Sequence, residues 1–239
     1  MRVSREILLN LAKDHAGRLA AKDRGIACIF IAGSLLNPDP FLGGVTDIDL
    51  VCVHDRPAPI PREIVRISAD VHLDVSHYEQ EFFTPARKLR TDPWLGSLLA
   101  RGPLVLRDPL HWFDFIRSTA TAQFNQSENL AERVRGFVGP ARLTWQALVD
   151  ETIPQGLKRT EALLEVIRDT ANAAASFSGA PLPTRRLFVE LPDRCSKSGL
   201  PDIAGNLVQA FTNESVTDDN WGDWFAGWES AYDQANELN

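Results

Sequence analysis

Cysteine is scarce in this sequence, and long apolar runs are missing from it. The 239 residues include three cysteines, Cys28, Cys52 and Cys195, which show none of the short spacings of metal ligands. An odd number of cysteines, two of them inside apolar runs, indicates small core residues in a reducing compartment. Charged residues interrupt the apolar ones over 1–22, unlike in a signal peptide, and no later segment approaches a membrane span. We therefore expect a cytoplasmic protein with no membrane partner.

Clusters of positive charge are scarce as well. Residues 1–110 contain 14 Lys and Arg and 14 Asp and Glu, whereas residues 111–239 contain 11 and 18, so the second half carries the whole net charge of −7. Proteins that bind DNA or RNA neutralise phosphates with clustered Lys and Arg. The one run of this kind is Arg87, Lys88 and Arg90, and a short charge run is more often a solvated face. The composition disfavours nucleic acid as a substrate.

Apolar patterns change character near residue 110. With 44% hydrophobic residues, the chain can bury a sizeable core, and its length allows two small domains. Before residue 110, helical spacing behind a capping Ser4 is followed by short β-rich apolar runs, whereas helical spacing dominates afterwards. We therefore predict the α+β class, with a sheet-containing domain over residues 1–110 and an all-helical C-terminal domain over residues 111–239.

The individual elements follow from periodicity and from Gly and Pro punctuation. The first domain should begin with a helix at 4–22, followed by strands at 26–32, 47–53 and 71–77. One or two helices interrupted near Pro93 should follow at 79–101, and then a short strand at 104–106. The strand over 71–77 alternates between apolar and polar residues, which predicts a half-buried strand with Asp74 on the polar face. The second domain should contain helices at 111–124, 127–150, 157–178, 184–195, 202–211 and 218–237.

Paired carboxylates on one predicted strand indicate a metal site. Asp47 and Asp49 are separated by one residue, so their side chains lie on the same face of the strand, about 6.6 Å apart. Both can reach shared divalent ions, whereas Ile48 faces the opposite way, into the core. The spacing predicts a pair of oxygen ligands for ions such as Mg²⁺.

A Gly-Ser pair ends the preceding predicted strand. Gly33 allows the backbone to pass close to a phosphate, because no side chain stands in the way. Ser34 should open a helix or a tight turn, whose free N–H groups and hydroxyl can hold phosphate oxygens. Metal ligands and a phosphate loop facing one another suit in-line attack on the α-phosphate of a nucleoside triphosphate.

Together these motifs resemble a known family. Gly33-Ser34, then Asp47-Ile48-Asp49, then a strand carrying Asp74, resemble the signature of the DNA polymerase beta superfamily of nucleotidyltransferases. Among its small bacterial members, the chain looks most similar to antibiotic nucleotidyltransferases typified by kanamycin nucleotidyltransferase and to uncharacterised relatives. The resemblance covers about residues 25–108. It implies a small mixed β-sheet flanked by helices, two Mg²⁺ ions, Asp47 and Asp49 as ligands, and Asp74 as the third carboxylate.

The carboxylates also have ordinary structural interpretations. Asp47 and Asp49 could be solvated residues at the rim of the sheet, an interpretation that we would favour if Gly33 and Ser34 were absent. Asp74 could be an exposed strand position, with Asp70 as the nearest competing carboxylate. A second Gly-Ser pair at residues 96–97 follows no apolar strand and precedes no paired carboxylates, so the dipeptide alone predicts nothing. The ordered set of strand, Gly-Ser, loop and Asp-x-Asp strand is what favours a site.

Histidines and aromatic residues are assigned no role in the site. His54, His72 and His77 lack a repeated ligand spacing, so we interpret them as solvated strand histidines. An aromatic stripe recurs at helical spacing near the end of the chain, where it is more often a packed helix face than a ligand platform. That stripe comprises Trp221, Trp224, Phe225, Trp228 and Tyr232.

These observations predict a transferase with Asp47, Asp49 and Asp74 as catalytic and metal-binding residues, and with Gly33 and Ser34 as nucleotide-binding residues. The expected reaction is Mg²⁺-dependent transfer of a nucleoside monophosphate, from ATP or another triphosphate, to a hydroxyl of a small acceptor. The acidic helical domain would favour a cationic acceptor. Asp74 could bind the second ion or accept the acceptor's proton. Two alternative functions remain open: transfer of AMP to a partner protein, and nucleotide binding without catalysis. The protein could also form a homodimer.

Overall fold

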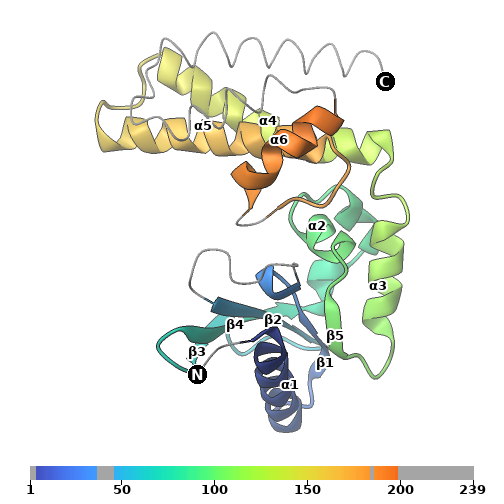
Figure 1. Cartoon of the computed structure of the whole chain (residues 1–239). Helices are drawn as coiled ribbons and strands as arrows, with labels where there is room; N and C mark the ends of the chain where they lie inside the picture. Colours follow the sequence, from blue (N-terminus) through green and yellow to red (C-terminus); the bar gives the residue numbers. More distant parts are fainter. Residues whose placement is uncertain (1–3, 37–45, 184–185, 199–239) are drawn as a thin grey trace. The chain divides into compact units, whose positions relative to one another are not determined.

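The computed structural model describes residues 4–36, 46–183 and 186–198 (Figure 1). The chain divides into two compact units, Met1–Gln123 and Phe124–Asn239. Our expected boundary at residue 110 differs from this division by one helix, α3 (Trp112–Thr121), which packs in the first unit against β1. The fold is nonetheless of the predicted α+β class, with a mixed sheet and a helical C-terminal part.

A five-stranded sheet forms the centre of the first unit. Its strands are β1 (Ile26–Ile31), β2 (Thr46–His54), β3 (Arg62–Arg66), β4 (Val71–Glu79) and β5 (Leu104–Arg107). Their order in the sheet is β3-β4-β2-β1-β5, in which β2 and β4 run parallel and every other neighbouring pair runs antiparallel. The predicted strands correspond to β1, β2, β4 and β5, whereas β3 was not predicted. It follows a Pro-rich stretch and lies at the edge of the sheet, where alternate residues are exposed.

The amphipathic first helix covers one face of this sheet. Helix α1 (Arg5–Lys22) begins at the predicted cap, since the backbone N–H of Ile7 donates to the Ser4 hydroxyl at 3.3 Å. Its buried residues pack against one of the two apolar clusters on the sheet. That cluster includes Leu8, Ala12, Ala16, Ile29, Ile31, Ile48, Leu50, Cys52, Leu73 and Val75.

The opposite face of the sheet packs against four later helices of the first unit. These are the 3₁₀ helices η2 (Gln80–Phe83) and η3 (Ala86–Arg90), with α2 (Leu95–Ala100) and α3. The region 79–101 is thus more broken than predicted, because Pro85 interrupts it as well as Pro93. The apolar cluster on this side includes Cys28, Phe30, Val51, Val53, Phe83, Leu89, Leu99 and Phe113.

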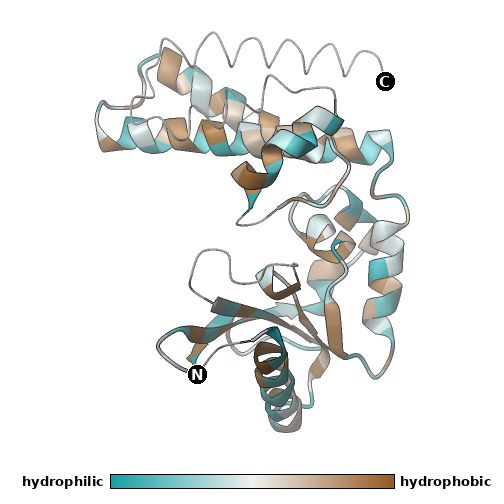
Figure 2. Cartoon of the chain, in the orientation of Figure 1, coloured by the Kyte–Doolittle hydropathy of each residue, from teal (hydrophilic) through white to brown (hydrophobic). Residues whose placement is uncertain are grey.

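The second unit is helical over its described residues. It contains α4 (Ser127–Val149), α5 (Leu157–Ser176) and α6 (Leu187–Lys197), which enclose a core that includes Val134, Phe137, Val166, Ile167 and Leu191. Hydrophobic and hydrophilic bands alternate along α4 and α5, as expected for amphipathic helices (Figure 2). The helices predicted at 202–211 and 218–237, and the aromatic stripe, lie outside the described residues.

All three cysteines are buried and free of disulfides, as the sequence predicted for core residues. Burial raises the pKa of Cys52 to about 12 and that of Cys195 to about 11, so both thiols stay protonated and unreactive. Within the part of the chain that the structure describes, none of the helices combines the length and the apolar character of a membrane span.

Candidate active site

The parallel pairing of β2 with β4 brings the predicted carboxylates together. Asp49 lies in register beside Asp74, and Asp47 lies beside His72. Neighbouring strands are about 4.8 Å apart, and residues in register point to the same face. Val51 and Val53 follow Asp49 with the strand period and pack into the cluster opposite α1. The three aspartates therefore share the sheet face opposite α1, beyond the end of that apolar cluster.

These aspartates are not solvated residues at the rim of the sheet. Asp47 is 7% exposed, Asp49 is half-buried, and the side chain of Asp74 is 14% exposed. The competing carboxylate, Asp70, is exposed in the turn before β4, where its backbone N–H donates to the Ser68 hydroxyl at 3.3 Å. Position on the strand thus distinguishes Asp74 from Asp70.

Gly33 lies against the carboxylate of Asp49. Its φ of +70° falls in the left-handed region, where a side chain is strained. A Cβ added there would lie 1.6 Å from Oδ2 and 2.6 Å from Cγ of Asp49. The adjacent backbone N–H of Ala32 donates to the carbonyl of Asp49 at 2.9 Å. The missing side chain thus makes space for a carboxylate of the candidate site, and the expected space for a phosphate stays a prediction.

The turn after Gly33 is one 3₁₀ turn, η1 (Ser34–Leu36), consistent with the predicted tight turn. Leu35 anchors it in the cluster beneath α1, where its side chain is 1% exposed. The Nε of Arg5, in the first turn of α1, donates to the Leu35 carbonyl at 3.1 Å. Ser34 is half-buried at the start of this anchored turn. The Gly-Ser segment is therefore held to the sheet from both the core and α1.

Arg62 is a residue of the site that sequence reasoning missed. Its Nε donates to Oδ1 of Asp74 at 2.7 Å, and its Nη2 donates to Oδ2, so the guanidinium engages both carboxylate oxygens. The hydrogen bond to Asp74 raises the pKa of Arg62, and the charges of Asp74, Asp49 and Asp47 raise it further. The alternation in Arg62-Glu63-Ile64-Val65-Arg66 is the signal that could have identified β3 and its face.

The chemistry of the donors fits a hard divalent cation, since carboxylate oxygens are the ligands that Mg²⁺ prefers. The present arrangement is not a complete ligand set: within the described ranges, no three His, Cys, Asp or Glu side chains gather closely enough to hold a metal. Asp47 and Asp49 have the donor chemistry for such a cation, whereas both oxygens of Asp74 are engaged by the guanidinium of Arg62.

Two of the three histidines contradict the sequence interpretation. His54 and His77 are 1% and 9% exposed, and Nε2 of His54 and Nδ1 of His77 share a hydrogen bond of 2.9 Å. They are buried rather than solvated because each lies two residues after a member of the α1-side cluster, Cys52 or Val75, and so shares its face of the sheet. His72 is half-buried on the carboxylate face. The buried pair lies on the sheet face opposite the carboxylates.

The basic run after β4 divides between the surface and a contact with α3. Arg87 and Lys88 are exposed on η3, as predicted for a solvated face. Arg90 instead links η3 to α3, because its Nε donates to the carbonyl of Thr119 at 3.0 Å. The second Gly-Ser pair, at 96–97, is buried inside α2.

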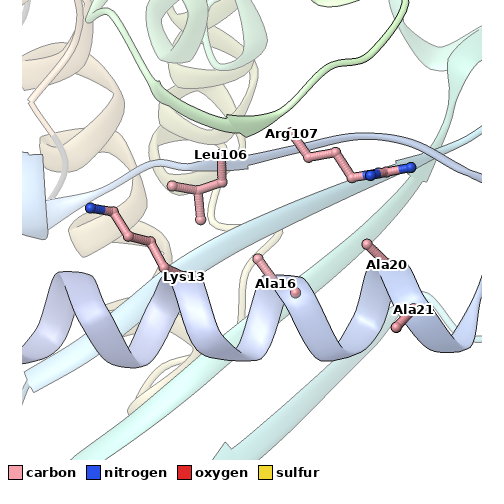
Figure 3. Close-up of a pocket in the computed structure, with 7 residues that line it drawn as sticks. Lys13, Ala16, Ala20, Ala21, Leu106 and Arg107 are labelled. Carbon is pink, nitrogen blue, oxygen red and sulfur yellow. The ribbon is translucent and has the colours of Figure 1, made fainter.

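A groove of about 410 Å³ lies on the other side of the sheet (Figure 3). It lies between α1 and β5, where small residues of the helix leave room, and it is flanked by Lys13 from the helix and Arg107 from the strand. Its lining residues are Lys13, Ala16, Gly17, Ala20, Ala21, Leu106 and Arg107. Ala16 and Leu106 belong to the α1-side cluster, so the groove is separated from the carboxylates by the sheet itself.

Comparisons with known proteins define the fold. No model of a protein family matches the sequence, and no curated protein matches it. Among solved structures, the chain is similar to a nucleotidyltransferase-like protein from Exiguobacterium sibiricum, with a TM-score of 0.51 and 8% identity. The matched part covers 95% of this chain and 75% of that one. The chain thus has a nucleotidyltransferase-like fold, and at this identity the likeness extends to the fold alone.

Proposed function

We propose that the protein is a nucleotidyltransferase that transfers a nucleoside monophosphate from a triphosphate, preferably ATP, to a hydroxyl of a small acceptor. The observation that supports this proposal is the same-face, in-register placement of Asp49 and Asp74, with Asp47 one step along β2. The anchored Gly33-Ser34 turn lies directly against Asp49. The nucleotidyltransferase-like fold agrees with this reaction.

In the proposed reaction, the acceptor oxygen forms a bond to the α-phosphorus, and the bond from that phosphorus to the bridging oxygen breaks. Pyrophosphate leaves with the electron pair of the broken bond. Asp47 and Asp49 would hold Mg²⁺, with two ions in the full site, and Ser34 with the N–H groups of its turn would hold phosphate oxygens. Bound Mg²⁺ would offset the charge on the attacking and leaving oxygens.

Asp74 has two candidate roles in this scheme. It would complete the binding of the second ion, with the acceptor hydroxyl's proton passing to solvent water, or it would accept that proton itself. The two roles compete, because a neighbouring metal ion lowers the pKa of a carboxylate and weakens it as a base. Arg62 weakens Asp74 in either role while it engages both oxygens, because its hydrogen bonds and positive charge oppose both a cation and a proton there.

The acceptor is proposed to be small and either cationic or neutral, such as an amino sugar. This follows the resemblance to kanamycin-type enzymes and the net charge of −7, all of which belongs to residues 111–239. Transfer of AMP to a partner protein is the second candidate, and it would require a partner surface. A silent nucleotide-binding protein is disfavoured, because Asp47, Asp49 and Asp74 are all intact.

The test is nucleotidyl transfer by the purified protein with each of four α-labelled nucleoside triphosphates, Mg²⁺ or Mn²⁺, and an acceptor library that includes aminoglycosides. We expect label on a small molecule and release of pyrophosphate. Asp49→Asn should abolish transfer, whereas the exposed turn variant Asp70→Asn should leave it unchanged. Label on a protein from cell lysate would select AMP transfer to a partner. If the protein binds a triphosphate but transfers no nucleotide to any acceptor class, the remaining candidate is a catalytically silent nucleotide-binding protein.

A further inference from the structure

We propose that Arg62 is a positioning residue whose guanidinium holds Asp74 and competes with a divalent cation for that carboxylate. The inference rests on the proposed function, because it assigns Asp74 to the metal and nucleotide site. It predicts that Arg62 weakens metal binding to the free protein and is displaced when the site is loaded.

The contact is a two-point contact, which makes it a direct competitor of a metal. The guanidinium donates from Nε and Nη2 to the two different oxygens of Asp74. A fork of this shape matches a carboxylate more closely than a single-point cation does. A metal that coordinates Asp74 through the lone pairs that Arg62 uses must replace at least one of these hydrogen bonds.

Charge explains why a cation belongs at this position. Asp49 and Asp74 are register neighbours, and Asp47 lies one step along the same face, so three negative groups converge there. Like charges at this spacing destabilise one another unless a positive group lies between or beside them. Arg62 provides that positive charge from β3, next to β4 in the sheet.

Exposure shows which partner can move. The side chain of Asp74 is 14% exposed, whereas that of Arg62 is 60% exposed. Arg62 is the first residue of an edge strand, and its side chain belongs to none of the apolar clusters. The guanidinium can therefore swing away without opening the core, while Asp74 stays fixed on β4.

The same strand offers a matched control. Arg66 is paired in register with His72, and Arg62 with Ser76, so both arginines lie on the carboxylate face of β3. Both are exposed residues of the same type. Replacing either with glutamine removes one positive charge from the same face, but only Arg62→Gln removes the two hydrogen bonds to Asp74.

The test is titration of the nucleotide-free protein with Mn²⁺, with free Mn²⁺ measured by electron paramagnetic resonance. We expect Arg62→Gln to bind Mn²⁺ about two- to fivefold more tightly than the wild type. Arg66→Gln should change the affinity much less, and Arg62→Lys should fall between the wild type and Arg62→Gln. The gain in Mn²⁺ affinity over the wild type should vanish in the double variant Arg62→Gln, Asp74→Asn. Thermal unfolding of each variant checks the fold.

The outcomes separate this inference from the proposed function, because the titration needs no turnover. Equal Mn²⁺ affinities for Arg62→Gln and Arg66→Gln would overturn the role of Arg62 and leave the nucleotidyltransferase proposal standing. The expected gain in a protein that transfers no nucleotide would overturn the proposed function and leave Arg62 as the competitor. No Mn²⁺ binding by any variant would overturn both.

Discussion

At the scale of single residues, the contact between Gly33 and Asp49 links the turn to the metal half of the site. A Cβ at position 33 would overlap the Asp49 carboxylate even before any nucleotide binds. A substitution at position 33 therefore affects both the position of Asp49 and the space for a phosphate. Metal binding measured without nucleotide separates the two effects, because of the two it depends only on the position of Asp49.

We predict that Gly33→Ala weakens Mn²⁺ binding to the nucleotide-free protein, because Asp49 must shift, and that it costs about 1–3 kcal/mol of stability through the positive φ. Ser34→Ala should leave Mn²⁺ affinity unchanged and reduce triphosphate affinity by about 0.5–1.5 kcal/mol, the contribution of one hydrogen bond. Calorimetric titrations with metal and then with nucleotide measure both. Equal Mn²⁺ affinities for Gly33→Ala and the wild type would contradict the role given to Gly33.

Buried histidines make the stability of the first unit depend on pH. Burial is the largest cause that lowers the pKa of His15, His54 and His77, and nearby Asp23 and Glu63 only partly oppose it. The folded-state pKa values therefore lie below the unfolded value of about 6.5. Stability is complete above that value and is lost as the pH falls through the folded pKa values, by up to about 1.4 kcal/mol per pH unit for each histidine.

The measurement is urea unfolding between pH 8 and pH 5. We expect the unfolding free energy to fall below pH 6.5, and His77→Gln to reduce the fall, since glutamine can hydrogen-bond to His54 without titrating. His111→Gln is the control, because the side chain of His111 is 83% exposed. Identical pH profiles for wild type and His77→Gln would show that the buried pair does not cause the dependence.

At the scale of elements, Asp108 connects β5 to α3. Its Oδ1 accepts from the N–H of Trp112 at 3.0 Å, and its Oδ2 accepts from those of Phe113 and Asp114 at 2.9 and 3.3 Å. A single carboxylate thus satisfies three free N–H groups at the start of the helix. This cap directs α3 onto the sheet, where Phe113 stacks on Phe30 with ring centroids 4.4 Å apart.

We predict that Asp108→Ala lowers the free energy of unfolding by about 1–2 kcal/mol, as for loss of a strong N-terminal cap. Asp114→Ala, in the first turn of the same helix, should have a smaller effect, because the side chain of Asp114 is 61% exposed. Denaturant unfolding of the two variants makes the comparison. Similar losses in both would mean that the helix needs the negative charge rather than the cap.

At the scale of the whole molecule, charge should influence the choice of acceptor. The net charge of −7 comes from residues 111–239, and an acidic protein attracts cations through a potential that salt screens. We predict a rising KM for a cationic acceptor such as an amino sugar as ionic strength increases, with little change for a neutral analogue. Steady-state kinetics at two salt concentrations measures this difference. Tight, strongly salt-dependent binding of tRNA, with nucleotide addition to its 3′ end, would instead indicate a terminal transferase.

Local periodicity was enough to predict much of the first unit. The alternation over 71–77 correctly placed Asp74 on the polar face of β4, and the capping residue of α1 was identified as Ser4. The i, i+2 spacing put Asp47 and Asp49 on one face of β2. These features depend on backbone geometry within one element, which the order of residues determines by itself.

Contacts between elements were decided only by the tertiary structure. The parallel register of β2 and β4 aligns Asp49 with Asp74 and places His54 against His77. The edge strand β3 brings Arg62 to the carboxylate of Asp74. The conformation of Gly33 leads its backbone against Asp49, a contact that no spacing along the chain reveals. Each depends on which strands pair and in which register, and packing across the whole sheet sets that choice because a slip of one residue would expose the core.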